Sequence, residues 1–321
     1  MVARLDSFQR RHPGAGFPLA VAYKYFDDFG PFLAALITYY GFVSMFPLLL
    51  LLSTILGFVL SGDTHLQQQV LNSALQQFPV VGAQLGDPRR LGGGTTGLVV
   101  GIVGSLYGGL GVAQAVQYAM NTAWRVPRNS RPNPFTARGR SLLLLATGGV
   151  AVVATTTLTI VGGSGAGSLG PALKVLALVA STAVNSGIFI FVSIIATSRR
   201  LSVRDVAPGA VAAAVVWQLL QSFGVVYVGH VVRNASATNG VFAVVLGLVA
   251  FLYITAAALV ICVEVNVVRV DKLSPRALLT PFTDNVNLTA GDRSAYASQA
   301  EAQRSKGFEV VDVTFEQEEG R

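Results

Sequence analysis

The chain has 321 residues, of which 52% are hydrophobic and only 12% are charged. Soluble domains usually carry about 25% charged residues, so this composition, with a mean hydropathy of +0.57, excludes an ordinary soluble protein and predicts an integral membrane protein. The net charge is +7, and the single cysteine, Cys262, excludes an internal disulfide and a cysteine-based metal cluster.

Six apolar runs are long enough to cross a membrane, because a spanning helix needs about 20 mostly apolar residues. In chain order they occupy residues 32–60, 97–123, 141–161, 172–198, 206–231 and 241–268. The first run begins too late and is too long for a cleaved signal peptide. The expected fold is therefore an all-α membrane protein whose bundle of six transmembrane helices occupies residues 31–270.

The lysines and arginines near the ends of the runs predict the orientation. Fifteen of them lie before the first run or after the second, fourth and sixth runs, and only four lie in the other connections. The positive-inside rule then places both termini in the cytoplasm, with residues 1–30 as a cytoplasmic N-terminal segment. We interpret the basic loops as topology signals and expect no nucleic-acid partner.

Two longer polar segments flank the runs. Residues 64–79 place Leu66, Val70 and Phe78 at helical spacing, which predicts an amphipathic helix on the outer surface. Residues 271–321 are predicted to be a cytoplasmic, mostly disordered acidic tail. Its end, "VVDVTFEQ", alternates apolar and polar residues and could add as a strand to the sheet of a protein partner.

The first two runs contain features that bear on helix packing. Pro47 lies in the middle of the first run and should kink that helix, either as a hinge or as a fixed bend. Glycines four residues apart in the second run, such as Gly104 and Gly108, predict close packing on a neighbouring helix. That neighbour belongs either to the same chain or to a second copy in a homo-oligomer.

Uncharged polar side chains recur inside the second, fourth and fifth runs. Such groups avoid lipid and face the bundle interior or water. They either join helices by hydrogen bonds or line a path for the headgroup of a substrate. The candidate path residues are Gln114, Gln117, Asn121, Asn185, Gln218 and Gln221.

One acid, Glu264, interrupts the last run, which reads "AAALVICVEVNVVRV" over residues 256–270. A helix that enters near Gly240 crosses the roughly 30 Å core within about 20 residues, so Glu264 and Asn266 should lie near the inner interface. We expect Glu264 to form an ion pair or gate with an arginine of the cytoplasmic rim, where arginines could also hold anionic lipid headgroups. The candidate arginines are Arg125, Arg199 and Arg200.

The chain lacks a recognisable catalytic constellation. Its three histidines have no metal-ligand spacing, and a nuclease would need clustered carboxylates for metal-assisted hydrolysis. Asp27 and Asp28 are adjacent, but we interpret them as capping residues at the entrance of the first spanning helix. We therefore expect no catalytic residue, no metal, no cofactor and no enzymatic activity.

Four stretches in this order resemble one family. They are "AALITYYGFVSMFPLLLLL" (34–52), "AVQYAMNTAWRVP" (115–127), "APGAVAAAVVWQLLQ" (207–221) and "GLVAFLYITAAALVICVEVN" (247–266). Together they resemble the YihY/BrkB family of bacterial inner-membrane proteins, which has also carried a ribonuclease-BN-like label. The family-like residues are Tyr39, Ser44, Pro47, Asn121, Trp124, Pro208, Gly209, Trp217, Glu264 and Asn266.

The resemblance implies six spanning helices, cytoplasmic termini, a location in the bacterial plasma (inner) membrane, and links to envelope integrity and virulence. One departure bears on packing: Cys262 and Val263 stand where the family usually has Gly and Ala, which are small enough for close helix contact.

Three functions follow as hypotheses from the residues and the resemblance. The favoured one is transport or flipping of a lipid or envelope precursor through the polar path, with membrane lipids as partners. The second is a non-transporting scaffold that organises envelope proteins, with the tail binding a partner. The third and weakest is an intramembrane enzyme or ribonuclease.

Overall fold

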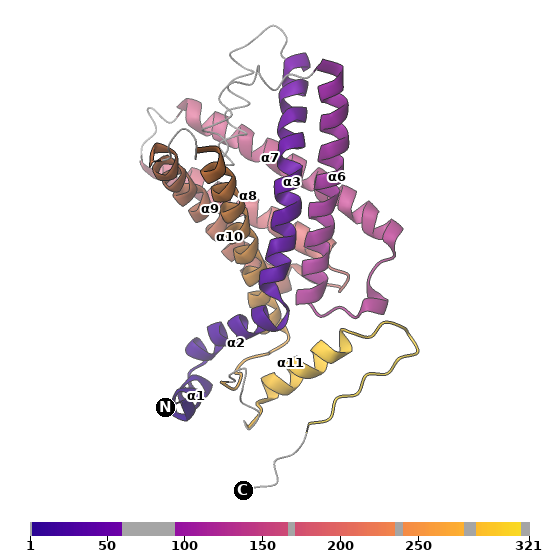
Figure 1. Cartoon of the computed structure of the whole chain (residues 1–321). Helices are drawn as coiled ribbons and strands as arrows, with labels where there is room; N and C mark the ends of the chain where they lie inside the picture. The colour runs from indigo at the N-terminus through magenta and orange to yellow at the C-terminus, as the bar shows by residue number, and fades with distance from the viewer. Residues whose placement is uncertain (1, 60–93, 166–170, 235–239, 279–286, 316–321) are drawn as a thin grey trace.

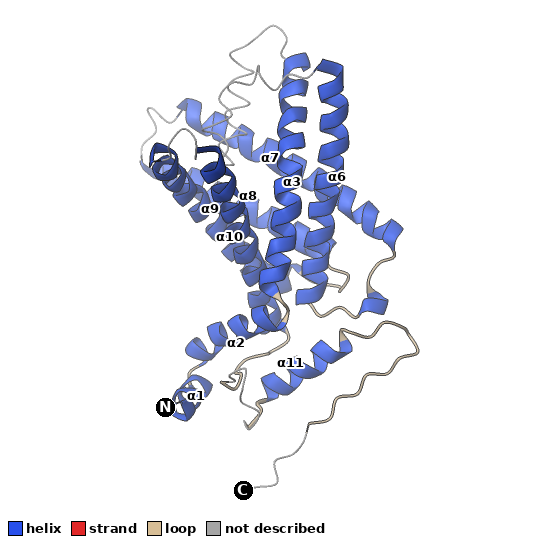
Figure 2. Cartoon of the chain, viewed as in Figure 1, coloured by secondary structure: helices blue, strands red, loops and turns tan. Residues whose placement is uncertain are grey.

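The computed structural model describes residues 2–59, 94–165, 171–234, 240–278 and 287–315. Within these ranges every regular element is a helix, as Figure 2 shows. The predicted all-α class is therefore confirmed for the part of the chain that the structure describes. The predicted surface helix at 64–79 lies outside the described residues.

Six long helices correspond to the six predicted apolar runs. They are α3 (Gly30–Val59), α6 (Gly94–Ala123), α7 (Pro134–Gly165), α8 (Pro171–Ala196), α9 (Val203–Asn234) and α10 (Gly240–Val270). Over the described residues, α6, α8, α9 and α10 are long and apolar enough to cross a membrane, and α3 contributes a shorter apolar segment, Gly30–Met45. Pro47 lies within α3, whose helical conformation continues through it.

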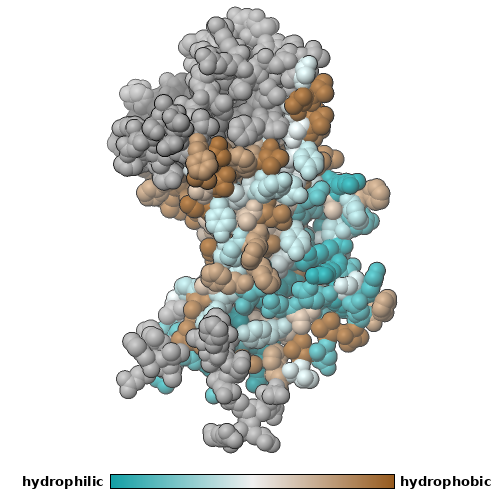
Figure 3. All heavy atoms as spheres, in the orientation of Figure 1, coloured by the Kyte–Doolittle hydropathy of each residue, from teal (hydrophilic) through white to brown (hydrophobic). Residues whose placement is uncertain are grey.

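Large apolar side chains are exposed along the outer surfaces of these helices. Examples are Val103 on α6, Leu176 on α8, Phe223 on α9 and Ile254 on α10. Extended apolar surfaces of this kind are unusual on a water-soluble monomer, whereas they are expected on a protein that contacts lipid. In Figure 3 hydrophobic residues predominate on the upper part of the described surface, and hydrophilic residues gather lower on it. The chain is thus a membrane protein with several apolar helices.

The short helices gather at one end of the bundle, where α3 begins and α10 ends (Figure 1). They are α1 (Val2–Arg11), α2 (Pro13–Asp27), the 3₁₀ helix η2 (Arg128–Ser130) and α11 (Ala290–Glu301). The described residues therefore begin and end on the same side of the bundle. We call this side the terminal end.

Helix α11 corrects the prediction of a mostly disordered tail. Thr289 caps the helix: its side chain accepts a hydrogen bond from the backbone N–H of Asp292, and the Asp292 carboxylate accepts one from the backbone of Thr289. Ala295 on the same helix is fully buried in the core of the terminal end. The acidic composition of the tail concealed this local signal, because only a few of its residues need to be buried to fix the helix.

Helices α3 and α6 pack closely along their length, as their adjacent ribbons in Figure 1 indicate. A Cβ atom at Gly108 would lie 2.5 Å from the Cα atom of Ser44, which is shorter than any real contact of that kind. The glycine pattern of α6 therefore serves a neighbour in the same chain, and that neighbour is α3.

Pro208 breaks the hydrogen-bond ladder near the start of α9, and Arg269 of α10 repairs it. A proline has no N–H, so the carbonyl oxygen of Arg204, four residues earlier, loses its helical donor. The guanidinium of Arg269 donates to that oxygen at 2.6 Å and to the carbonyl oxygen of Asp205 at 3.0 Å. An arginine at the end of α10 thus satisfies backbone groups that the proline frees.

Asn266, one turn earlier on α10, completes this junction. Its Nδ2 donates to the carbonyl oxygen of Val206 at 2.9 Å, and its Oδ1 accepts the backbone N–H of Gly209 at 2.7 Å. Gly209 permits this approach, because a Cβ atom there would lie 2.2 Å from the carbonyl oxygen of Cys262. The close helix contact that Cys262 and Val263 put in doubt is therefore provided by a glycine on α9.

We predict that Gly209→Ala destabilises the α9–α10 junction, since its added methyl group would meet both the carbonyl oxygen of Cys262 and the Asn266 amide that joins the two helices. Overpacking of this kind costs about 1–3 kcal/mol, so the thermal midpoint of the detergent-solubilised protein should fall by several degrees. Gly187→Ala on α8 is the matched control, because its Cβ atom would meet nothing within 4 Å. Equal midpoints for the two variants would contradict the assigned contact.

Candidate functional site

A buried group of charged residues joins α2, α6 and α10 at the terminal end. The side chains of Lys24 on α2 and Glu264 on α10 are both 0% exposed, and Lys24 Nζ lies 3.0 Å from Glu264 Oε2. The same ammonium group pairs with Asp28 and donates to the carbonyl oxygen of Ala123, the last residue of α6, at 2.7 Å. One lysine thus fixes three elements that are far apart in sequence.

Arg125 extends this group to α11. Its Nε lies 3.5 Å from Asp28 Oδ1, and its Nη1 donates to the carbonyl oxygen of Ala295 and to Ser298 Oγ, the latter at 2.5 Å. We call Lys24, Asp28, Arg125 and Glu264 the charge cluster. It contains two basic and two acidic side chains, so it is formally neutral, as buried charges require.

The partner of Glu264 differs from the expected one. It is Lys24, one of the fifteen basic residues that indicate the orientation, and not Arg125, Arg199 or Arg200. Arg125 belongs to the same cluster but pairs with Asp28. The lysine could have been found from its i, i+4 spacing to Asp28, which on a helix brings opposite charges together.

The other two rim arginines lie elsewhere. Arg199 forms a bidentate ion pair with Asp271, at 2.8 and 2.9 Å, and its guanidinium lies 5.2 Å from the ring of Trp124. Hydrogen bonding to Asp271 raises the pKa of Arg199 above its ordinary value, against the opposing effect of burial. Arg200 is exposed.

A second buried arginine, Arg276, holds the tail to α2. It lies 2.9 Å from Asp292 of α11 and 2.5 Å from Asp27 of α2, and it packs over the rings of Tyr23 and Tyr296. Burial alone would lower the pKa of Arg276, but the two carboxylates outweigh it and raise that pKa. The guanidinium therefore remains charged in its buried position.

Asp27 and Asp28 are therefore not capping residues of α3, as interpreted from the sequence. They are adjacent, so their side chains diverge, and each binds a different cation, Arg276 or Lys24. A sequence signal for the tail contact did exist: the Thr-x-x-Asp spacing of Thr289 and Asp292 is a helix-capping pattern.

Two of the candidate path residues act as links between helices. Gln117 Nε2 donates to Ser141 Oγ on α7 at 2.8 Å. Asn121 accepts the backbone N–H of Ser198 at 2.8 Å and donates to the carbonyl oxygen of Ala196 at 3.3 Å, which ties α6 to the end of α8. Gln117 and Asn121 therefore form interhelical hydrogen bonds, which was one of the two roles that the sequence allowed for them.

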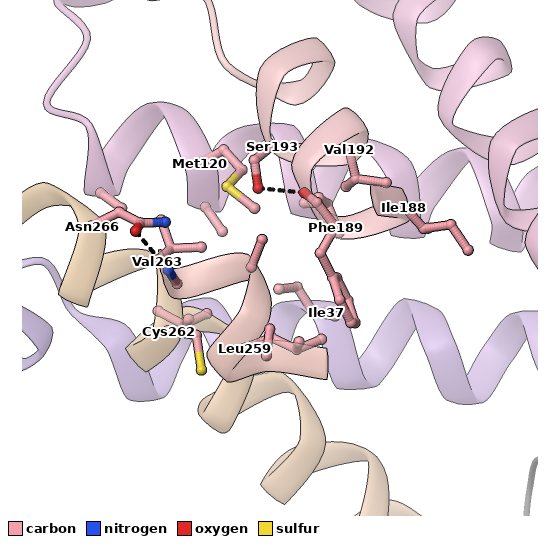
Figure 4. A pocket seen from close by; sticks show the side chains of 17 residues that line it. Ile37, Met120, Ile188, Phe189, Val192, Ser193, Leu259, Cys262, Val263 and Asn266 are labelled. Carbon is pink, nitrogen blue, oxygen red and sulfur yellow. Dashed lines mark hydrogen bonds between the residues drawn. The ribbon is translucent and has the colours of Figure 1, made fainter. Parts of the chain in front are cut away.

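An apolar cavity of about 220 Å³ lies between α3, α6, α8, α9 and α10. Figure 4 shows Ile37, Met120, Phe189 and Val263 around it. Its polar lining includes Asn266, whose Oδ1 is already bonded to Gly209, and Ser193, whose hydroxyl is bonded to the carbonyl oxygen of Phe189. We call this space the central cavity; it offers apolar contact rather than hydrogen bonds.

The candidate path residues do not line the central cavity. Gln114, Gln117 and Asn121 line a separate groove of about 430 Å³ beside the opposite face of α6. Asn185, Gln218 and Gln221 line neither space. Asn185 lies one turn before Ile188 on α8, and Gln221 lies three turns after Ala210 on α9. Since Ile188 and Ala210 line the central cavity, Asn185 and Gln221 lie on the cavity-facing sides of their helices, farther from the terminal end.

Among the residues that the structure describes, no three His, Cys, Asp or Glu side chains gather where they could hold a metal ion.

The comparisons with known proteins concern most of the membrane part. The family model described as "Virulence factor BrkB" matches residues 21–281. No curated protein and no solved structure matches the chain. The matched range begins before Lys24 and ends after Arg276, so it includes both buried arginines and the whole charge cluster.

We predict that Lys24→Met destabilises the protein by about 3–5 kcal/mol, because it leaves an unpaired buried carboxylate. Adding Glu264→Gln should restore part of the lost stability, since the remaining pair, Asp28 and Arg125, is again neutral. The measurement is the thermal midpoint of the four proteins in a double-mutant cycle. Lys306→Met, at an exposed lysine, serves as the control, and purely additive losses would disprove the coupling.

We predict that acid releases α11 from the bundle. Burial alone would raise the pKa of Asp292, but hydrogen bonds from Arg276, Thr289 and the backbone outweigh it and hold that pKa below its ordinary 3.8. The stabilisation by this carboxylate is therefore complete above the ordinary value and is lost as the pH falls through the lower, folded value.

Asp292→Asn should reproduce this release at neutral pH. Trypsin cleavage after Arg293 should become faster in that variant, whereas Ser294→Ala, at an exposed position beside the cleavage site, should leave the rate unchanged. A tail equally resistant in both variants would show that Asp292 does not hold α11.

Proposed function

The chain belongs to the BrkB virulence factor family, and from that premise we propose that it moves a lipid or an envelope precursor across the bacterial plasma membrane. The proposal treats it as a multi-pass protein in which all six long helices span the membrane. It assigns no catalytic step to the chain.

The central cavity is the observation that carries this proposal. It lies where five helices meet, within segments apolar enough to be in the membrane. Engineered apolar cavities on the order of 150 Å³ stay dry and admit small apolar molecules. At about 220 Å³, the space is suited to part of an acyl chain and is too small for a large headgroup.

The amides beyond the cavity support a continuing path. Asn185 on α8 and Gln221 on α9 extend two cavity faces toward the end opposite the termini, and both are partly buried. A mostly apolar substrate with a polar headgroup would need such groups on part of its route. Gln218 is a further candidate on α9, although it lies away from the cavity-facing side.

The basic residues support a cytoplasmic terminal end. Arg128, Arg138, Arg200, Arg204 and Lys272 are exposed there, in the loops or helix ends where the positive-inside rule expects cytoplasmic charge. We therefore propose that α1, α2 and α11 face the cytoplasm.

Binding of a protein partner is a second candidate function, favoured by the segment after α11. Phe308 and Val310 are 85% and 90% exposed on a stretch without regular structure. Since α11 itself is fixed to the bundle, only this outer part of the tail is free to contact a partner. A scaffold role would use this segment and would not require the central cavity.

We predict that Ala213→Leu, which fills part of the central cavity, slows translocation by about tenfold or more. The assay measures the rate at which fluorescent phosphatidylglycerol in the inner leaflet of proteoliposomes becomes accessible to an added quencher. Ala250→Leu makes the same change at an exposed position of α10 and should leave the rate unchanged.

Two results would reject transport through this cavity. One is a rate in wild-type vesicles no higher than in protein-free vesicles, under conditions where the protein retains its thermal midpoint. The other is an unchanged rate in a folded Ala213→Leu variant. Deletion of residues 307–321 that abolishes envelope function while translocation continues would favour the partner-binding role.

A further inference from the structure

The groove beside α6 is separate from the central cavity and differs from it in chemistry. It is formed by α3, α6, the loop after η2 and the first turns of α7, which lie next to one another toward the terminal end (Figure 1). Its volume of about 430 Å³ falls in the range of roughly 300–1,000 Å³ usual for small-molecule sites.

Two arginines line this groove without a carboxylate partner in the described part of the chain. Arg131 donates its Nε to the carbonyl oxygen of Val126 at 3.2 Å and lies 5.3 Å from the ring of Tyr118. Arg138, on α7, is exposed. Arg125, Arg199 and Arg276, by contrast, are each paired with an aspartate. Positive charge is therefore left without a carboxylate partner at this groove.

A buried acceptor belongs to a residue in the wall of the same space. Gln117 lines the groove and is nearly fully buried; its Nε2 is bonded to Ser141 and to the carbonyl oxygen of Ala137. Its Oε1 has no hydrogen-bond partner among the described residues. A buried acceptor without a donor is costly, so a ligand that brings a hydroxyl or N–H group would be favoured there.

The remaining walls are amphipathic. Leu36 and Tyr40 of α3 form one side, and Tyr118 of α6 is half exposed beside Arg131. Tyrosines and arginines gather at the level of lipid headgroups, because their side chains combine an apolar body with a polar tip.

We propose that this groove binds the headgroup of an anionic phospholipid from the leaflet at the terminal end. Arg131 and Arg138 contact the phosphate, for which planar guanidinium groups are well matched. A headgroup hydroxyl lies against the polar wall at Gln114 and Gln117, and Leu36 and Tyr40 contact the glycerol and the first methylenes.

This assignment does not require transport, because the groove and the central cavity lie on opposite faces of α6. The protein could bind an anionic phospholipid in this groove without translocating any lipid, and it could translocate lipid without preferring an anionic one in the groove. The binding experiment and the translocation experiment can therefore fail independently.

The test is native mass spectrometry of the full chain in neutral detergent, titrated with phosphatidylglycerol or with phosphatidylcholine. Wild type should retain phosphatidylglycerol preferentially. The double variant Arg131→Gln/Arg138→Gln should weaken that binding by about tenfold or more, because it removes both charge-assisted contacts to the phosphate. Arg138→Gln alone should give a smaller loss of binding. This single variant leaves the intramolecular contacts of Arg131 intact, so its loss reports on lipid binding and not on folding.

Arg128→Gln is the matched control, since Arg128 is exposed on η2 and does not line the groove. Equal losses in this variant would mean that general surface charge attracts the lipid, and the proposal would be overturned. It would also be overturned by an absence of preference for phosphatidylglycerol, or by folded groove variants that bind like wild type. Displacement of phosphatidylglycerol by glycerol 1-phosphate at similar concentration would assign the groove to a soluble phosphate and reject the lipid.

Discussion

The ion pair between Lys24 and Glu264 is the interaction on which the terminal end depends. Both side chains are fully buried, so neither can recover hydration if the other is lost, and the surrounding groups must supply all compensation. The carbonyl oxygen of Ala123 and the carboxylate of Asp28 bind Lys24, and Arg125 in turn pairs with Asp28. Because these groups come from α2, α6 and α10, the positions of three helices are fixed by the requirement for neutrality, and α11 is added through Arg125.

At the α9–α10 junction, buried backbone groups are likewise satisfied by side chains of a neighbouring helix. Pro208 introduces an unsatisfied carbonyl oxygen, and side chains one turn apart on α10, Asn266 and Arg269, satisfy the groups around it. The central cavity lies directly beside this junction, since Gly209 and Asn266 both line it. The hydrogen bonds of the junction therefore fix the cavity wall that α9 and α10 form.

Much of the fold could be predicted from the sequence because spanning helices produce a strong signal. Each apolar run became a long helix, and the glycines of α6 correctly indicated a close neighbour. The partner of Glu264 was missed because loop arginines were considered and the lysine of α2 was not. The predicted polar path required the amides of different helices to line one common space. In the structure Gln117 lines the groove beside α6, whereas Asn185 lines neither that groove nor the central cavity. Such separation depends on helix rotation, which sequence spacing within single helices cannot give.

The buried pair also determines when the molecule can be completed. Lys24 and Glu264 are 240 positions apart, and Arg276 and Asp27 are 249 apart. A chain is made from its N-terminus, so α2 emerges from the ribosome with Asp28 beside Lys24 but long before Glu264 and Arg276 exist. The buried site of Lys24 is therefore complete only after α10 has been made. Assembly of the terminal end is thus a late event in biogenesis, because a chain that ends before residue 264 lacks both Glu264 and Arg276.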